Sequence, residues 1–184
     1  MSLIGRISLY AALMLSAAAS HAAGLRGVEL GDPCGMASDI EFRLGSSLVR
    51  SDGSVPLLHY HGTYSGKDAD IVYICDNHIL ADQVIMIRTS DRDAAFQTAG
   101  EIKESVIKEF GAPSYDGLGL NYAEKLWRSL WGVSGDVMLQ SAIWQVQGRE
   151  VFLWVRNDEK DGWEIRLSQS SHIDMIADAY RGIN

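Results

Sequence analysis

The chain has 184 residues and a formal net charge of −8, from 24 acidic and 16 basic side chains. After removal of a leader, this length can hold one domain with a sizeable core. The basic residues form no cluster, so the acidic balance argues against nucleic acid and anionic lipid as partners. The charge therefore favours a function that needs neither.

Residues 1–23 have the layout of a secretory signal peptide. Arg6 lies in a short n-region, an apolar run covers 7–19, and small residues lead to a cleavage site after Ala22 or Ala23. The run has about 13 residues, whereas a membrane anchor needs roughly 20. No later segment is apolar and long enough to span a bilayer. We expect a mature chain of 24–184, exported to the periplasm or, as the alternative, to the extracellular space.

Residues 24–113 predict a strand, a helix, three strands and a helix. Residues 25–31 read as a short strand, and 32–45 as a helix capped by Asp32 and closed by Gly45. Strands follow at 55–64, 70–76 and 79–89. A long helix is expected over 90–111. The expected apolar stripes are Met36, Ile40 and Leu44 in the first helix, and Ala95, Ala99, Ile102, Val106 and Phe110 in the second.

Residues 114–184 predict a loop, a short helix over 122–132, and a second set of three strands at 137–146, 150–156 and 163–168. A helix from Ser171 to Tyr180 follows. The fold class is therefore α+β, a single domain with antiparallel sheet in two related halves, 24–113 and 114–184, and helices packed on the sheet. The order is β-α-βββ-α and then α-βββ-α.

Cys34 and Cys75 are the two cysteines of the chain. An isolated pair in an oxidising compartment most often forms a disulfide. The bond would close a loop of about 40 residues and stabilise the fold by roughly 3 to 4 kcal/mol in the chain-entropy model. Metal binding or a catalytic thiol is less favoured, because neither cysteine has C-x-x-C spacing.

Glycine and proline recur in the stretches GVELGDP…RLG and FGAP…W of the two halves. This pattern resembles small envelope domains, namely the outer-membrane assembly lipoprotein BamE and the β-lactamase inhibitor proteins. The resemblance rests on about a dozen positions. The chain departs from the pattern of these domains in one respect, because its later half has no second cysteine pair. It implies binding rather than catalysis.

His59 and His61 lie two positions apart in the expected strand 55–64, so they share one face of the sheet. With a turn at residues 66–67, His59 would pair with Ile74 and His61 with Val72. This pairing brings no third imidazole, thiolate or carboxylate near them, and zinc usually takes at least three protein ligands. We expect sheet-surface residues and no metal site.

The two faces of the sheet differ in what covers them. A Cys34–Cys75 bond would place the first helix over the face of Leu58, Tyr60, Tyr73 and Cys75. The histidines would then lie on the other face, beside Val55, Leu57, Val72, Ile74, Ile85 and Ile87. A sheet face this apolar is seldom exposed to water. We therefore expect either the second half of the chain or a partner to cover it.

Four tryptophans join the histidines as candidate partner contacts. Trp127 and Trp131 are four apart on one face of the expected helix 122–132, and Trp144 and Trp154 lie in the later strands. Tryptophan is common at binding hot spots, although most such residues in a small domain belong to the core. At least one of Trp144 and Trp154 could be exposed.

Catalytic patterns are weak. The chain has no G-x-S-x-G elbow and no Gly-rich phosphate loop with its lysine, and Asp91 and Asp93 fit the start of a helix. We expect no catalytic residue, cofactor or metal, and a protein that acts by binding another protein as an inhibitor, an immunity-like protein or an assembly factor. The alternative is a small-ligand-binding protein or hydrolase with a pocket between the two halves.

Overall fold

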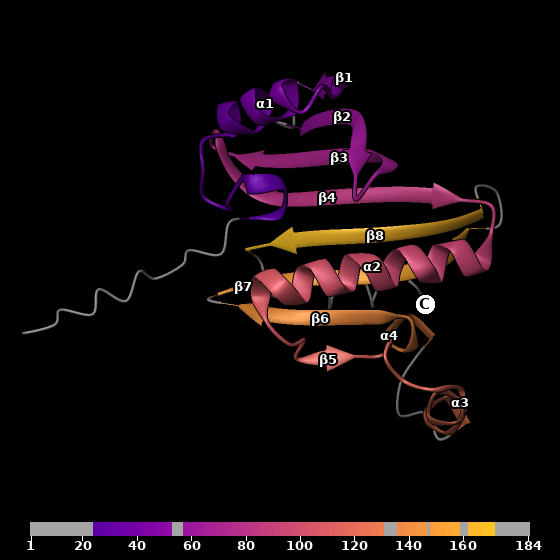
Figure 1. Cartoon of the computed structure of the whole chain (residues 1–184). Coiled ribbons are helices and arrows are strands. Elements are labelled where there is room, and N and C mark those ends of the chain that lie inside the picture. The colour runs from indigo at the N-terminus through magenta and orange to yellow at the C-terminus, as the bar shows by residue number, and fades with distance from the viewer. Residues whose placement is uncertain (1–23, 53–56, 131–135, 147, 159–161, 172–184) are drawn as a thin grey trace, which may run out of the picture.

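The computed structural model describes residues 24–52, 57–130, 136–146, 148–158 and 162–171 (Figure 1). The expected signal peptide, Trp131, and the expected C-terminal helix after Ser171 lie outside these residues. The elements in chain order are η1 (Leu25–Gly27), α1 (Cys34–Arg43), β1 (Ser47–Asp52), β2 (Leu57–Tyr64), β3 (Lys67–Asp76), β4 (Ile79–Thr89), α2 (Arg92–Phe110), β5 (Tyr115–Asp116), α3 (Tyr122–Leu130), α4 (Asp136–Leu139), β6 (Ser141–Val146), β7 (Arg149–Asp158) and β8 (Gly162–Ser170).

The strands of the described part form one antiparallel sheet in the order β1-β2-β3-β4-β8-β7-β6-β5. Each half contributes consecutive hairpins, and β4 of the first half pairs with β8 of the second from Asp82–Ser170 to Thr89–Trp163. Figure 1 shows this junction in the middle of the sheet. The predicted α+β class is confirmed, and the two halves share a single sheet.

Helices α1 and α2 cover the same face of the sheet. Helix α2 contacts β4, β6, β7 and β8, and lies across the second half in Figure 1, while α1 contacts β2 and β3. The predicted stripe of α2 is confirmed, because Ala95, Ala99, Ile102 and Val106 are buried. The side chains under both helices form one core, which includes Ile71, Tyr73, Ile85, Ile87, Leu153, Ile165 and Leu167.

The Cys34–Cys75 disulfide is present, with 6.3 Å between the two Cα atoms and a sequence separation of 41. It ties the start of α1 to the end of β3. The predicted apolar stripe of α1 is wrong at Met36 and Leu44, which are exposed, whereas Ile40 is partly buried against the core. The side chains that α1 buries are Cys34, Ala37 and Glu41.

The predicted strand 25–31 is wrong, since the described segment begins with the short 3-10 helix η1. The cause is an ion pair that the local pattern does not reveal. Arg26 Nε lies 2.6 Å from Glu41 Oε1, and both side chains are almost fully buried. Residues 47–52 instead supply the edge strand β1, and residues 136–139 form α4 where we expected the start of a strand.

The register of the first hairpins also differs from the prediction. His59 pairs with Val72 and His61 with Asp70, because the chain turns at residues 65–66, one residue earlier than expected. A bulge between Ile74 and Cys75 then shifts the β3–β4 pairing by one. A shift of one residue exchanges the faces of a strand. Ile85 and Ile87, expected beside the histidines, therefore lie in the core under the helices.

No helix in the described ranges is both long and apolar enough to cross a membrane.

Candidate functional site

Helix α3 begins with a capping box. The side chain of Asn121 accepts a hydrogen bond from the amide of Glu124 at 2.9 Å, and the carboxylate of Glu124 accepts one from the amide of Asn121 at 2.9 Å. Each side chain thus satisfies an amide that the helix leaves without an internal partner. The sequence N-Y-A-E therefore fixes where α3 starts.

The apolar side of α3 is exposed. Tyr122 is 82% exposed, Leu126 46%, Trp127 63% and Leu130 73%. Positions 122, 126 and 130 are four apart and 127 is adjacent to 126, so these side chains lie along one side of the helix. No residue of α3 is buried. We call these four side chains the α3 surface, and Figure 1 shows α3 set apart from the sheet beyond β5.

The loop before helix α3 and the side chain of Lys125 connect the helix to the rest of the fold. Asp116 accepts hydrogen bonds from Lys103 Nζ at 3.0 Å and from the amide of Gly119 at 2.7 Å. A Cβ at Gly119 would meet the Asp116 carboxylate, so a larger residue there would displace that side chain from its hydrogen bonds. Lys125 Nζ lies 5.8 Å from the centre of the Phe96 ring on α2. Partial burial is the main cause of the lowered pKa of Lys125.

A shallow hollow of about 410 Å³ runs along α3. Asn121, Ala123, Glu124, Trp127 and Arg128 line it. Trp127 therefore contributes both to the hollow and to the α3 surface. An exposed aromatic side chain beside a concave strip can anchor a partner, because aromatic anchors dominate the binding energy of protein interfaces.

The face of the sheet opposite α1 and α2, which we call the open face, carries the two histidines. His59 Nε2 lies 3.2 Å and His61 Nδ1 3.5 Å from the same oxygen of Asp70, whose other oxygen lies 2.6 Å from Arg88. Burial would raise the pKa of Asp70, but the hydrogen bonds to these three side chains lower it overall. Sequence reasoning missed Asp70 because the expected register placed Val72 opposite His61.

The open face continues as a row of charged side chains. Glu164 is almost fully buried and lies 3.5 Å from Arg88, 3.2 Å from Arg156 and 2.9 Å from Arg166. Three guanidinium groups thus surround one carboxylate. Their positions on neighbouring strands follow from the β4–β8 and β8–β7 registers, which a single sequence does not reveal.

Trp144 and Trp154 do not provide exposed partner contacts. Trp144 is buried in the core, and its indole nitrogen donates a hydrogen bond to the carbonyl of Gly111 at 2.9 Å. Trp154 is buried on the open face, with the guanidinium groups of Arg156 and Arg166 5.5 and 5.4 Å from its ring centre. Of the expected contacts, Trp127 is exposed and His61 is more exposed than His59.

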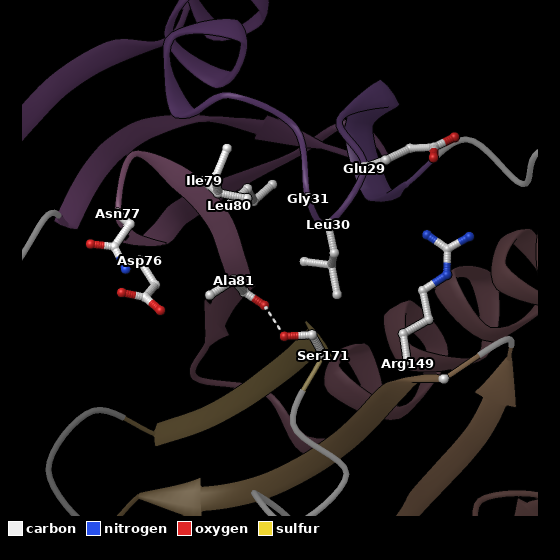
Figure 2. Close-up of a pocket in the computed structure, with 11 residues that line it drawn as sticks. Glu29, Leu30, Gly31, Asp76, Asn77, Ile79, Leu80, Ala81, Arg149 and Ser171 are labelled. Atoms are coloured by element: carbon white, nitrogen blue, oxygen red, sulfur yellow. Dashed lines mark hydrogen bonds between the residues drawn. The ribbon is translucent and has the colours of Figure 1, made fainter.

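A larger hollow, of about 680 Å³, lies between segments of both halves at one end of the sheet (Figure 2). Figure 2 shows Glu29 and Arg149 on one side of it and Asp76 and Asn77 on the other. The hydroxyl of Ser171 hydrogen-bonds the carbonyl of Ala81 at 3.3 Å. The lining residues of the described part include neither His nor Cys, the usual partners or nucleophiles of a hydrolytic site.

The signal for the α3 surface was present in the sequence. Trp127 was predicted as a contact, but Tyr122, Leu126 and Leu130 were not, although their spacing of four marks the same side of a helix. Periodicity identifies an apolar side without telling whether other elements cover it. Only the fold shows that the core of the described residues lies away from α3 and leaves this side of the helix exposed.

No protein-family model, curated protein or solved structure matches this chain. The resemblance to BamE and to the β-lactamase inhibitor proteins stays a prediction.

Proposed function

We propose that this chain is an exported, non-enzymatic protein that binds another protein, and that the α3 surface is its binding site. The observation that carries the proposal is the exposure of Tyr122, Leu126, Trp127 and Leu130 along one side of a capped helix. Large apolar side chains gathered in this way usually mark an interaction site. An amphipathic helix with anchors at this spacing fits an apolar groove on a partner.

Export to the periplasm is part of the same proposal. The Cys34–Cys75 disulfide supports it, because such bonds persist in oxidising compartments. The signal-peptide pattern of residues 1–23 supports it as well, although those residues lie outside the described ones. Inhibition, toxin neutralisation and envelope assembly are the roles that this placement favours.

The test is site-specific photo-crosslinking in cells that export the chain. A photoreactive amino acid at Trp127 should crosslink to a defined protein, whereas the same group at Phe42 should not. Phe42 is the matched control because it is also an exposed aromatic side chain, 82% exposed against 63% for Trp127, but lies on α1, away from the α3 surface. With the identified partner purified, Trp127→Ala should weaken binding by a factor of about ten or more, as for other aromatic anchors. Phe42→Ala should leave binding unchanged, and equal effects of the two substitutions would contradict the proposal.

The hollow between the two halves favours a second candidate, a small-ligand-binding protein. Its lining combines the charges of Glu29, Asp76 and Arg149 with apolar Leu30 and Ile79. Sites for small molecules often lie in concave regions with a few polar groups. Chemical-shift mapping with a small-molecule library distinguishes the two candidates, because ligand shifts would centre on residues 29–31 and 76–81 rather than on α3.

A further inference from the structure

Three arginine side chains meet on the open face, although they are far apart in the sequence. Arg88, Arg166 and Arg156 belong to β4, β8 and β7, which are neighbours in the sheet. Glu164 pairs with Arg88 on one side and with Arg156 on the other, and Arg166 follows two positions further along β8. Residues two apart on a strand share a face. The strand order therefore brings three positive charges together on a chain whose net charge is −8.

Arg156 and Arg166 share the charge of a single carboxylate oxygen. Oε1 of Glu164 lies 3.2 Å from Nε of Arg156 and 2.9 Å from Nη2 of Arg166. Arg88 lies 3.5 Å from the other oxygen of Glu164, and its closer ion pair is with Asp70 at 2.6 Å. Among the described residues, Asp70 and Glu164 are the carboxylates that form ion pairs with the three arginines. Three positive charges therefore face two negative ones.

Several hydrogen-bond donors beside Glu164 have no acceptor. Nε of Arg166 donates to Glu164 at 3.1 Å, but Nε of Arg156, although it lies close to the same oxygen, has no hydrogen-bond partner in the described part of the chain. The indole nitrogen of Trp154, which lies beside both arginines, has none there either. A guanidinium group and an indole nitrogen only donate hydrogen bonds. A ligand that completes these contacts must therefore supply acceptors.

The two guanidinium groups are positioned by an aromatic ring and remain accessible. Their central carbon atoms lie 5.5 Å (Arg156) and 5.4 Å (Arg166) from the centre of the Trp154 ring, within the range of cation–π contacts. The side chain of Arg156 is 42% exposed and that of Arg166 31%, so a small ligand can reach both. Because paired strands and the ring hold these groups before a ligand arrives, binding costs little conformational entropy.

We propose that Arg156 and Arg166 form a binding site for an oxyanion group, either a carboxylate or a phosphate. The group accepts hydrogen bonds from both guanidinium groups and balances the positive charge that Glu164 leaves uncompensated. Arginine suits both kinds of oxyanion, because two parallel N–H groups match two oxygen atoms. Arg88, on the other side of Glu164, adds a third positive charge that favours an anion at this place.

A purely structural role explains these contacts less well. An ion pair that only joins strands is most favourable when its charges balance and the arginine binds the carboxylate through two hydrogen bonds. Here two arginines converge on one oxygen of Glu164, and Arg156 makes no hydrogen bond to it. The contacts are therefore those of a site that has one more cation than its own carboxylates balance.

Titration of the exported chain with inorganic phosphate, followed by nuclear magnetic resonance of the arginine and indole N–H groups, tests the proposal. Phosphate should shift the signals of Arg156, Arg166 and Trp154 until they saturate, whereas sodium chloride at the same ionic strength should not. Arg156→Gln should weaken phosphate binding by a factor of about ten or more, because it removes charge-assisted hydrogen bonds. Arg156→Lys keeps the charge but loses the paired donors, so it should retain part of the affinity.

Arg43→Gln is the matched control, since Arg43 is an exposed arginine on α1, and it should leave phosphate binding unchanged. Trp127→Ala should also leave it unchanged, which separates this site from the α3 surface. A parallel titration with glutarate distinguishes the two sources, because the anion that binds more tightly identifies the group as a carboxylate or a phosphate. If Arg156→Gln prevents folding, Arg156→Lys provides the comparison. Shifts that chloride reproduces, or phosphate affinity that is unchanged in the folded Arg156 variants, would overturn the proposal.

Discussion

Glu41 is a fully buried charged side chain that joins three parts of the first half. Its carboxylate accepts hydrogen bonds from Arg26 Nε at 2.6 Å and Nη2 at 2.8 Å, and further ones from Tyr73 and Ser46. Burial would raise the pKa of Glu41, but these hydrogen bonds and the charge of Arg26 lower it overall. The network thereby fixes η1 and α1 on the end of the sheet.

Glu41→Gln should destabilise the protein by about 3 to 5 kcal/mol, because it leaves the buried charge of Arg26 without its partner. The native contribution is complete above the ordinary pKa of 4.5 and is lost as the pH falls through the lower value in the folded state. Urea unfolding between pH 7 and 3 should therefore show a smaller acid loss of stability in the variant. Asp39→Asn, an exposed carboxylate on the same helix, is the control and should behave like the wild type.

The histidine pair should not hold a metal ion, although Asp70 lies within reach of both rings. The carboxylate of Asp70 already binds Arg88 at 2.6 Å, and the positive guanidinium group disfavours a cation beside it. We expect zinc titration by calorimetry to show no stoichiometric binding, and a chelator to leave the thermal unfolding midpoint unchanged. One zinc per chain that disappears in the double variant His59→Gln, His61→Gln would contradict this.

Helix α1 depends on its disulfide more than on its own apolar contacts. It buries Cys34, Ala37 and the polar Glu41, while Phe42 on the same helix is exposed. Removing the bond by Cys34→Ser with Cys75→Ser should cost about 4 kcal/mol, the chain-entropy value for a loop of this length. Thermal unfolding of the variant, and of the wild type with a reductant, should show equally lowered midpoints. An unchanged midpoint in both would mean that the bond contributes no stability.

The capping box of α3 allows the helix to be weakened without touching the α3 surface. Asn121→Ala should destabilise α3 by about 1 kcal/mol through loss of the cap. Because no residue of α3 is buried, the unfolding midpoint of the whole chain should change little. Binding to the crosslinked partner should weaken nonetheless. If binding is unaltered while the backbone amides of α3 lose protection in hydrogen exchange, the partner does not bind α3 in its helical form.

Local pattern was sufficient for the elements that obey simple periodicity. The sequence predicted α2 with its stripe from Ala95 to Val106, and it predicted the bounds of β4. It failed for α1, where Glu41 faces inward because Arg26 neutralises it across 15 positions of sequence. It also failed for the face of Ile85 and Ile87, because alternation does not reveal a bulge in the neighbouring strand.

The candidate sites also depend on how the whole chain folds, and not on local sequence alone. Trp127 and its neighbours could be found from spacing, but their exposure depends on which elements the rest of the chain brings near α3. The three arginines around Glu164 come from β4, β7 and β8 and meet only because β8 lies between the other two strands. Contacts of that kind depend on strand order, which a single sequence does not contain.

The two halves should unfold together. Strands β4 and β8 pair along their length across the boundary between the halves, and α2 of the first half covers β6, β7 and β8 of the second. Separating them would expose Ala99, Ile102, Leu153 and Leu167 to water, at a cost proportional to the apolar area. We therefore expect a single transition in urea, with coincident curves from near-ultraviolet dichroism, which reports Trp144, and from a fluorophore on the exposed Lys67 of the first half. Residues 24–113 expressed alone should lack a cooperative transition. Two separate transitions in the full chain, or a folded fragment, would show instead that the halves are independent units.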